Sequence, residues 1–208
     1  MLIIVDYGMG NLRSILYKLQ KFKIESAISS SPEDIEKADK LVLPGVGHFA
    51  KAMENLENRG LIPVLNKKVL EDKTPVMGIC LGVQLFTKSS EEGNVPGLGW
   101  IDAETKRFDF SGMTEQLPVP HVGWNKVMLR NKPPFWPEFP EDQHFYFTHS
   151  YYISCASPEN VAAVSFYGHE FVSAVWKDNI FGTQFHPEKS HRDGFELLRR
   201  FAEEVPLC

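Results

Sequence analysis

Apolar and polar positions alternate in blocks from the first residue to about Glu92, and the blocks predict a succession of strands and helices. Short apolar runs are typical of strands buried on both faces. The stretches between them repeat their apolar residues every three or four positions, as amphipathic helices do. Asn11 and Ser31 are expected to cap two of these helices. The predicted strands are 2–5, 24–29, 40–43 and 75–79, and the predicted helices are 12–22, 49–59, 61–71 and a short one beginning at Pro32.

The second half of the chain has short segments with the composition of β-strands. Asp178-Asn179 joins two of them as a hairpin turn, and prolines between Lys132 and Pro140 predict a surface loop. We therefore expect an α/β fold with a central, mostly parallel sheet flanked by helices and a β-rich C-terminal half. The predicted strands of this half are 104–108, 124–129, 145–147, 151–154, 161–167, 171–176 and 180–185, followed by a helix over 194–203.

The composition is that of an ordinary globular protein. With 208 residues, 43% of them hydrophobic and 24% charged, we expect one domain over 1–208. The net charge of −5 disfavours binding to nucleic acid or to an anionic membrane. No apolar run approaches transmembrane length, and the early Asp6 argues against a signal peptide. Three scattered cysteines do not indicate a disulfide framework, so a cytoplasmic location is expected.

Cys80 lies where an apolar run gives way to helical spacing, between Gly78 and Gly82. This is the pattern of a nucleophile elbow with cysteine in place of serine. The glycines permit a sharp turn, and the N-terminus of the following helix directs N–H groups at the sulfur, which favours the thiolate. The alternative is a buried cysteine beside a packed turn, because free cysteine is often buried.

His186 and Glu188 follow the last predicted strand, with Pro187 fixing the backbone between them. A cysteine nucleophile needs a base, and the base needs an orienting acceptor, so Cys80, His186 and Glu188 form a candidate triad. A polar turn that simply ends a strand is the alternative for residues 186–188. Two such features at the carboxyl ends of predicted strands, where parallel sheets carry their sites, favour catalysis.

A third strand end carries Pro44-Gly-Val-Gly47. Backbone N–H groups beside glycines can bind a developing negative charge, as an oxyanion hole requires. A tight turn between a strand and a helix would have the same sequence pattern.

Together these motifs resemble those of the class I, or triad, glutamine amidotransferases. The resemblance rests on Gly78-Ile-Cys-Leu-Gly82 with Gln84, on His186-Pro-Glu188 and on Pro44-Gly-Val-Gly47. Four further segments are similar to the HisH-type glutaminase subunits of imidazole glycerol phosphate synthase, and the likeness extends from residue 1 to about Phe201. These segments are Asp6-Tyr-Gly-Met-Gly-Asn-Leu12, Pro120-His-Val-Gly-Trp-Asn125, His149-Ser-Tyr151 and His186-Pro-Glu-Lys-Ser190.

The resemblance implies hydrolysis of L-glutamine to glutamate and ammonia through a thioester on Cys80. His186 would act as acid and base, and Glu188 would hold its imidazole. The family's oxyanion hole would fall at the Val46–Gly47 peptide and the Leu81 N–H.

The resemblance also implies binding positions, for which the residues alone leave plainer roles open. Trp124 could be core, Lys189 a solvated charge, and the pair at 150–151 ordinary strand residues. The implied substrate-binding residues are Gln84, Glu92, Ser150 and Tyr151, and the implied partner interface and ammonia passage include Asn11, Trp124, Asn125 and Lys189.

A partner is expected because a glutaminase alone would only discard nitrogen. The chain has neither a G-x-x-x-x-G-K-[ST] nor a G-x-G-x-x-G motif, and no second domain for an acceptor. We expect a heterodimer with a synthase subunit, and slow hydrolysis until that subunit and its ligand bind. In the histidine pathway the resemblance implies a (β/α)8-barrel cyclase that makes imidazole glycerol phosphate and AICAR. Neither a cofactor nor a metal is implied.

Other interpretations stay open. Close paralogues supply ammonia to sugar-modifying synthases of surface polysaccharide pathways, and the Lys132–Pro140 loop could be specific to one partner. A cysteine hydrolase or peptidase could share the triad, although Gln84 and residues 149–151 argue against it. A non-catalytic subunit would not need an intact triad. Val83 stands where the family often has methionine, and a one-residue shift could exchange Glu91 for Glu92 at the substrate.

Overall fold

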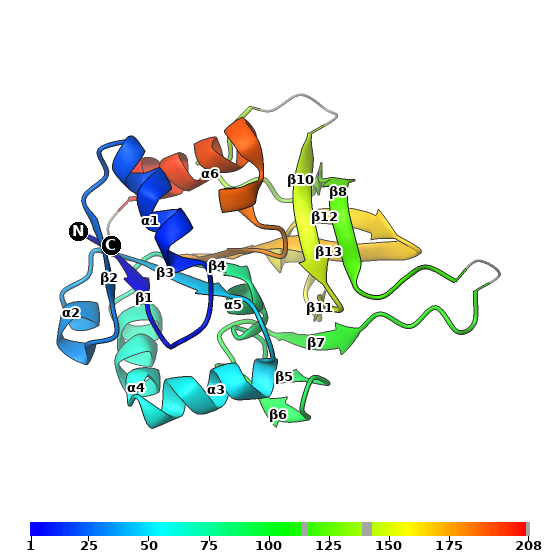
Figure 1. Cartoon of the computed structure of the whole chain (residues 1–208), viewed down its shortest axis with the longest axis horizontal. Helices are drawn as coiled ribbons and strands as arrows, with labels where there is room; N and C mark the ends of the chain where they lie inside the picture. The colour runs from blue at the N-terminus through cyan, green and yellow to red at the C-terminus, as the bar shows by residue number, and fades with distance from the viewer. Residues whose placement is uncertain (114–115, 139–142, 207–208) are drawn as a thin grey trace.

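The computed structural model describes residues 1–113, 116–138 and 143–206, and within them the chain forms fourteen strands and six α-helices (Figure 1). The strands are β1 (Leu2–Val5), β2 (Ser26–Ser29), β3 (Lys40–Gly45), β4 (Val76–Cys80), β5 (Ser89–Ser90), β6 (Val95–Pro96), β7 (Ala103–Arg107), β8 (His121–Lys126), β9 (Met128–Leu129), β10 (His144–His149), β11 (Tyr151–Cys155), β12 (Val161–Tyr167), β13 (His169–Lys177) and β14 (Ile180–Thr183). The helices are α1 (Leu12–Lys21), α2 (Pro32–Glu36), α3 (Phe49–Asn58), α4 (Leu61–Asn66), α5 (Leu81–Gln84) and α6 (His191–Glu204), with a π-helix η1 (Lys67–Glu71) and 3-10 helices η2 (Pro158–Asn160) and η3 (Pro187–Lys189).

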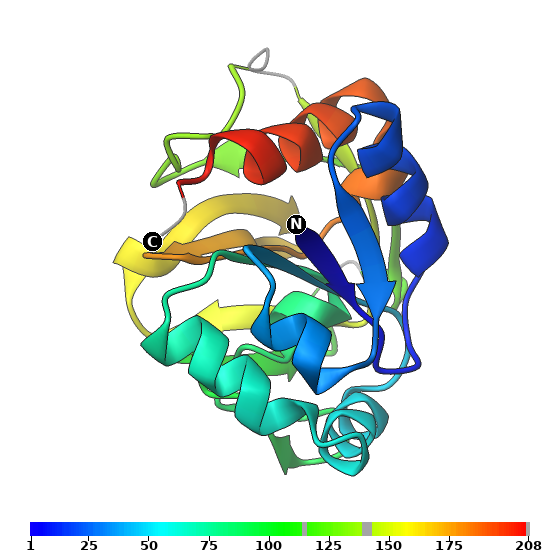
Figure 2. The same cartoon turned by 90° about the vertical axis from the view of Figure 1, so that its left-hand side faces the viewer.

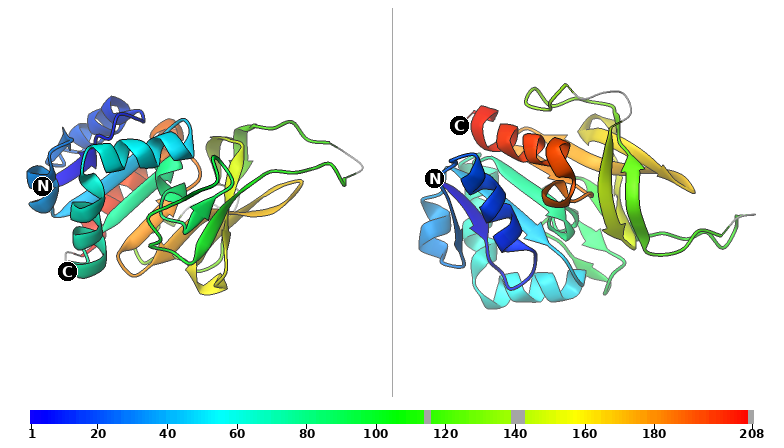
Figure 3. Two further views of the ribbon diagram at one scale, coloured as in Figure 1. Left: turned by 90° about the horizontal axis from the view of Figure 1, so that it is seen from below. Right: turned by 45° about the horizontal axis from the view of Figure 1, so that its top comes forward.

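The sheet has a parallel part and a mainly antiparallel part. Strands β2, β1, β3, β4 and β14 are parallel neighbours in that order. From β13 the sheet continues through β11 and β7 to β5 and β6, and β12 and β9 branch from β13. β8 and β10 form a separate two-stranded ribbon. Figure 3 shows the parallel part with its helices toward one end of the molecule and the β-rich part toward the other. The predicted fold class is confirmed.

Helices cover both faces of the parallel part because its strands are apolar on both faces. Leu2 and Ile4 of β1 belong to a core shared with α1 and α6. Ile3 and Val5, which point the other way, belong to a second core shared with α2, α3 and α4. Figure 2 shows these two sets of helices on opposite sides of the strands. Strands whose residues are nearly all apolar must be covered on both faces, and the result is three layers with helices on each side of the sheet.

The carboxyl ends of the parallel strands meet at one edge, and their register brings the motifs together. Gly45 at the end of β3 lies opposite Cys80 at the end of β4. Thr183 at the end of β14 lies opposite Ile79, the residue before Cys80. Loops that follow neighbouring parallel strands emerge side by side, which is where such sheets carry their sites.

Some local predictions differ from the structure. Asn11 occupies the N-cap position of α1 but its side chain makes no capping hydrogen bond, because its ψ of 62° is far from the extended value that a capping residue adopts. Ser31 does cap α2, accepting a hydrogen bond from the Asp34 N–H at 3.3 Å. The predicted helix 61–71 is α4 followed by the π-helix η1, and the predicted strand 124–129 breaks at Val127 between β8 and β9.

The predicted surface loop over residues 132–140 is in part buried. Phe135 and Trp136 have exposed fractions of only 6% and 1%. Their rings pack against Phe181 at 5.0 and 5.8 Å, and Phe135 also meets Phe201 of α6 at 6.1 Å. The prolines prevent strand pairing, but the aromatic side chains between them cover the end of a core. Pro140 lies outside the described residues.

None of the helices in the described part of the chain has the length and apolar character needed to span a bilayer. Cys80 and Cys155 are free thiols, and Cys208 lies outside the described residues.

Candidate active site

Cys80 sits at a sharp bend between β4 and α5. Its backbone has φ +53° and ψ −109°, a conformation that L residues adopt rarely and mostly at functional turns. Close packing requires both flanking glycines. A Cβ on Gly82 would lie 1.7 Å from the Leu43 carbonyl oxygen, and one on Gly78 would lie 2.7 Å from the Val83 Cα. The bend therefore has the tight backbone geometry expected of a nucleophile elbow.

The helix after Cys80 is shorter than its apolar spacing suggested. α5 has four residues, Leu81–Gln84, and then the chain turns away. A single turn has a small macrodipole, so the expected effect of a helix N-terminus on the sulfur reduces to the nearby N–H groups.

His186 and Glu188 lie buried beside Cys80, with exposed fractions of 1% and 4%. The His186 Nδ1 donates a hydrogen bond to Glu188 Oε1 at 2.8 Å. Because a carboxylate only accepts, Nδ1 carries the proton and Nε2 keeps a lone pair in the neutral ring. Nε2 has no hydrogen-bond partner among the described residues. It is therefore the atom available to take a proton from the cysteine.

The turn that holds His186 is fixed by β10. The His186 N–H donates to the Tyr146 carbonyl at 2.9 Å, and the Ser190 hydroxyl donates to the His186 carbonyl at 2.6 Å. The Cys80 sulfur lies 3.9 Å from the Thr148 carbonyl oxygen, which can accept a hydrogen bond from the thiol.

The electrostatics couple the sulfur to the imidazole. Burial alone would lower the pKa of His186, but the negative charge of Cys80 and then the Glu188 carboxylate outweigh burial and raise this pKa to about 9. An imidazolium beside a thiolate is the reactive form of a cysteine enzyme. The structure thus brings the three residues of the predicted triad together.

A pocket of about 280 Å³ opens onto Cys80. The residues predicted for the oxyanion hole and for substrate binding all line it, together with Pro120, Thr148 and His149. These predicted residues are Val46, Gly47, Leu81, Gln84, Glu92, Ser150 and Tyr151.

Tyr7 fixes the loop that carries the expected oxyanion peptide. The buried Tyr7 hydroxyl donates to the Pro44 carbonyl at 2.6 Å, just before Val46 and Gly47. Burial, followed by the charge of Cys80, raises the pKa of Tyr7 well above its usual value. The hydroxyl therefore stays protonated and keeps donating.

Two polar side chains in the pocket wall are fixed by the backbone. Gln84 donates from Nε2 to the Tyr151 carbonyl at 2.9 Å. Glu92 accepts a hydrogen bond from the Phe49 N–H at 2.7 Å, at the first residue of α3. Glu91 is exposed, lies outside this pocket and accepts a hydrogen bond from the Arg107 N–H. Of the two adjacent carboxylates, Glu92 is thus the one at Cys80.

Gln184 is a site residue that the sequence analysis did not single out. Its side chain is fully buried between Gln84 and Cys80. Gln184 Oε1 accepts from Gln84 Nε2 at 3.0 Å, and Gln184 Nε2 donates to the Cys80 sulfur at 3.7 Å. The available signal was a polar amide in the mainly apolar segment 180–185, two residues before His186. Such a residue needs buried partners, because an unpaired buried amide is costly.

The residues predicted for a partner interface lie at the surface near the site. Trp124 is 46% exposed and stacks on the His191 ring at 4.8 Å. The exposed Lys189 places its Nζ over the Tyr146 ring at 5.7 Å, and Tyr146 also meets Trp124. Asn125 is half-buried, and Asn11 is exposed at the start of α1. Trp124 is therefore not core, and Lys189 is an exposed charge that lies over an aromatic ring.

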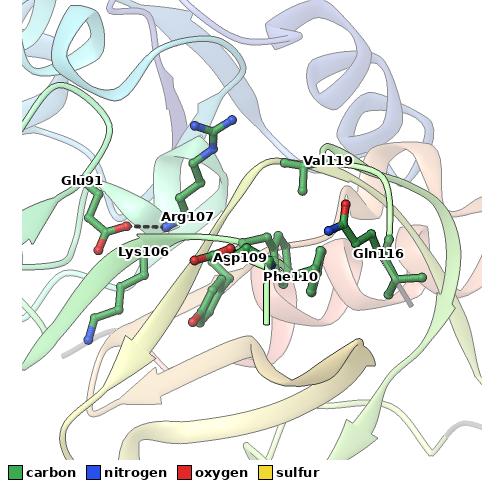
Figure 4. A pocket seen from close by; sticks show the side chains of 11 residues that line it. Glu91, Lys106, Arg107, Asp109, Phe110, Gln116 and Val119 are labelled. Atoms are coloured by element: carbon green, nitrogen blue, oxygen red, sulfur yellow. Dashed lines mark hydrogen bonds between the residues drawn. The ribbon is translucent and has the colours of Figure 1, made fainter. Parts of the chain in front are cut away.

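A larger hollow of about 680 Å³ lies beyond β7 (Figure 4). Lys106 and Arg107 stand on one side of it, Gln116 and Val119 on another, and the Glu91–Arg107 hydrogen bond closes one end. It contains no member of the triad, so it is not the catalytic pocket. No group of three or more His, Cys, Asp or Glu residues in the described ranges is placed to hold a metal ion.

Comparison with known proteins gives a consistent result. A family model described as glutamine amidotransferase class-I matches residues 3–205. The chain is 48% identical over 205 residues to a protein of Methanococcus maripaludis named imidazole glycerol phosphate synthase subunit HisH 2, covering 99% of this chain and 100% of that protein. It is 44% identical to a protein of the same name from Pseudomonas aeruginosa, with the same coverage.

A solved structure described as a crystal structure of glutamine amidotransferase superposes with a TM-score of 0.74. It covers 97% of each chain at 20% sequence identity, so this likeness concerns the fold alone.

Proposed function

Because the chain belongs to the class I glutamine amidotransferase family, we propose that it is the glutaminase subunit of an imidazole glycerol phosphate synthase. It hydrolyses the side-chain amide of L-glutamine to glutamate and ammonia. The observation that carries this proposal is the meeting of Cys80, His186 and Glu188 beside a polar pocket. The relatives from Methanococcus and Pseudomonas bear that subunit name and align over their whole length.

Cys80 is the nucleophile of the proposed reaction. His186 Nε2 takes the thiol proton, and the sulfur attacks the side-chain carbonyl carbon to give a tetrahedral oxyanion. His186 then gives the proton to the nitrogen, the C–N bond breaks, and ammonia leaves a thioester on Cys80. Water attacks the thioester while His186 takes one of its protons. The S–C bond then breaks, which releases glutamate and regenerates the thiol.

Glu188 and the oxyanion groups support these steps. The hydrogen bond from His186 Nδ1 to Glu188 holds the ring in the tautomer that leaves Nε2 free. Val46, Gly47 and Leu81 line the same pocket as Cys80, which supports the proposal that the Val46–Gly47 peptide and the Leu81 N–H bind the oxyanion. Donors fixed in advance at the developing oxyanion lower the barrier because they need no reorganisation.

The pocket wall supplies matching groups for an amino acid. Both hydrogens of Gln84 Nε2 are used inside the protein, so its Oε1 is left to accept from the ammonium or amide of glutamine. Glu92 offers a carboxylate for the ammonium group and is held in place by the Phe49 N–H. Ser150 and Tyr151 complete the wall.

The ammonia is passed to a partner subunit, which we propose to be a cyclase with a (β/α)8 barrel. The partner covers the surface that carries Trp124 and Lys189, with Asn11 and Asn125 nearby. An exposed tryptophan stacked on a second ring offers a large apolar contact of the kind that dominates protein interfaces.

The test is glutamate and ammonia release with and without the cyclase and its ligand. We expect turnover to rise strongly with the partner, and Cys80→Ala and His186→Ala to abolish it. Strong turnover by the isolated chain would overturn the dependence on a partner. Rescue of a histidine auxotroph would distinguish this pathway from a sugar-modifying synthase, because a paralogue would fail to restore growth.

A further inference from the structure

A line of four hydrogen bonds connects the molecular surface with the pocket at Cys80. Asn125 Nδ2 lies 3.3 Å from His121 Nε2, and His121 Nδ1 lies 3.0 Å from His149 Nε2. His149 Nδ1 lies 2.7 Å from the Tyr151 carbonyl oxygen, which also accepts from Gln84 Nε2 at 2.9 Å. The mechanism proposed above uses neither histidine. The presence of these two buried, hydrogen-bonded imidazoles is therefore not explained by the proposed reaction steps.

The strand register places these two rings in contact. His121 of β8 and His149 of β10 are directly opposite each other in the antiparallel ribbon. Both are buried, with exposed fractions of 4% and 6%. Aromatic rings enclose them: Tyr167 stacks on His121 at 4.1 Å, and Phe171 lies 5.3 Å from His149. Among the described residues, the hydrogen bonds of the two rings are those of the line.

The chemistry of the groups fixes the direction of every bond. A carbonyl oxygen only accepts, so His149 Nδ1 must carry a hydrogen. Burial lowers the pKa of His149 to about 3 and that of His121 to about 4, so both rings are neutral. His149 Nε2 is then an acceptor, which requires His121 Nδ1 to donate. His121 Nε2 is an acceptor in turn, and it receives its hydrogen bond from Asn125.

Asn125 agrees with this direction. Its other amide hydrogen is donated to the Phe166 carbonyl at 2.9 Å, which fixes Nδ2 rather than Oδ1 toward the histidines. Both hydrogens of the amide are therefore committed. One arrangement of protons satisfies all the groups, from the surface amide to the Tyr151 carbonyl.

We propose that Asn125, His121 and His149 are positioning residues for substrate binding, acting as a directed hydrogen-bond relay that fixes the Tyr151 carbonyl and through it Gln84. This inference rests on the proposed glutaminase function. The Tyr151 carbonyl has two acceptor sites, one filled by His149 and the other by Gln84. Loss of the His149 donor frees the carbonyl to move, and the amide of Gln84 moves with it.

The relay begins beside Trp124, on the surface assigned to the partner. A partner group that accepts a hydrogen from Asn125 competes with His121 for that hydrogen. The glutamine pocket is thereby sensitive to what covers this surface, without any change in the triad.

The decisive variant is Asn125→Asp, which keeps the size of the side chain and reverses its polarity. A carboxylate only accepts, so a neutral His121 must carry its hydrogen on Nε2 to bind the new side chain. His121 Nδ1 and the facing His149 Nε2 are then both acceptors, and the hydrogen bond between the two rings is lost. We measure the inactivation constant Ki and the limiting rate for a diazo-ketone analogue of glutamine at Cys80 in the full chain. We expect Ki to rise about tenfold, the effect of one buried hydrogen bond, with the limiting rate nearly unchanged.

Two further variants separate positioning from folding. His121→Leu removes both bonds and should raise Ki about tenfold. His121→Asn carries an NH2 near the place of Nδ1 and should recover most of the affinity, because it still donates to His149. Asn131→Asp is the matched control, since Asn131 is exposed and its side chain donates, among the described residues, to the carbonyls of residues 158, 159 and 161. Its Ki should equal that of the wild type.

Nitrogen NMR of 15N-histidine protein gives a readout that does not depend on activity. We expect His121 and His149 to carry hydrogen at Nδ1 in the wild type, and His121 to change tautomer in Asn125→Asp. An Nε2–H tautomer of His149 in the wild type, or an unchanged Ki in both Asn125→Asp and His121→Leu, would overturn the relay. Failure of the analogue to label wild-type Cys80 would instead overturn the glutaminase function.

Discussion

Thr183 of β14 lies opposite Ile79 of β4 in the parallel sheet, and this pairing brings together two segments a hundred residues apart. Cys80 follows one partner directly, and His186 follows the other by three residues. The bend at Cys80 and the turn at His186–Ser190 then face each other at the same edge. The candidate catalytic pair is thus a consequence of strand register.

The first prediction concerns Glu188. Glu188→Gln keeps the size of the side chain but replaces a charged group that can only accept with a neutral amide that can also donate. The tautomer of the His186 ring is then no longer fixed. We expect kcat with the partner bound to fall by about two to four orders of magnitude, as for other triads. Steady-state kinetics checks the fall, and an unchanged melting temperature would show that folding is intact. A loss of less than tenfold would contradict the role of Glu188.

The second prediction concerns pH. In the wild type the pKa of His186, about 9, lies above the unfolded value of about 6.5, so protonation stabilises the fold. This stabilisation is complete below pH 6.5 and is lost as the pH rises through about 9. In Cys80→Ala the negative charge beside the ring is gone, so the pKa of His186 falls.

NMR titration of His186 and urea unfolding of both proteins between pH 6 and 10 provide the measurement. The free energy of unfolding of the wild type should decline relative to Cys80→Ala over this window. An equal pKa in the two proteins would mean that the sulfur and the imidazole do not interact.

The third prediction concerns Gln184. Gln184→Glu replaces a donor to the sulfur with a carboxylate and so disfavours the thiolate. We expect the alkylation of Cys80 by a small neutral thiol reagent to slow and its pH profile to move to higher pH. Gln184→Met, which removes the donor without adding charge, should have a smaller effect. Equal rates in all three proteins would exclude a role for this amide at the sulfur.

The fourth prediction concerns the proline-rich segment. Trp136→Ala removes a buried indole that packs on Phe181, and should lower the free energy of unfolding by about 3–5 kcal/mol. Glu138→Ala, at an exposed ion pair with Lys132, should leave it nearly unchanged. Urea unfolding measures both. If Trp136→Ala weakened only partner binding and left stability intact, the segment would be an interface and not a core cover.

The fifth prediction concerns Trp124. Trp124→Ala should weaken cyclase binding by tenfold or more, because an exposed stacked tryptophan is typical of a binding hot spot. Its stability should change little. Leu70→Ala, at a similarly exposed apolar residue of η1, is the control and should bind normally. Isothermal titration calorimetry gives both affinities, and equal values would remove Trp124 from the interface.

The fold class and the triad could be predicted from the sequence because each depends on a local pattern of residues. Apolar runs mark strands that are buried on both faces, and glycines around Cys80 mark a bend that no larger residue fits. Contacts between distant segments were not accessible in this way. The burial of Phe135 and Trp136 depends on α6 and β14, which pass over them. The same holds for the His121–His149 contact, which requires the register of β8 against β10.

Gln184 illustrates a second limit. It follows directly on the last residue of β14, and its two partners, Gln84 and Cys80, come from a different helix and strand. Sequence motifs consist of residue types at fixed spacing, so they do not identify an amide whose role depends on tertiary contacts. The prediction that Asn11 caps a helix was wrong for the opposite reason, because its residue type suits a cap but its backbone angles do not.

The ribbon strand β10 carries a consequence for insertions and deletions. Tyr146 anchors the His186 backbone, Thr148 receives the Cys80 thiol, and His149 belongs to the relay. A one-residue indel within this strand would displace these contacts by about 3.3 Å and turn each side chain to the other face. Base, nucleophile and binding wall would then lose their mutual alignment together. Strand β10 should therefore tolerate substitutions that keep its length better than it tolerates insertions or deletions.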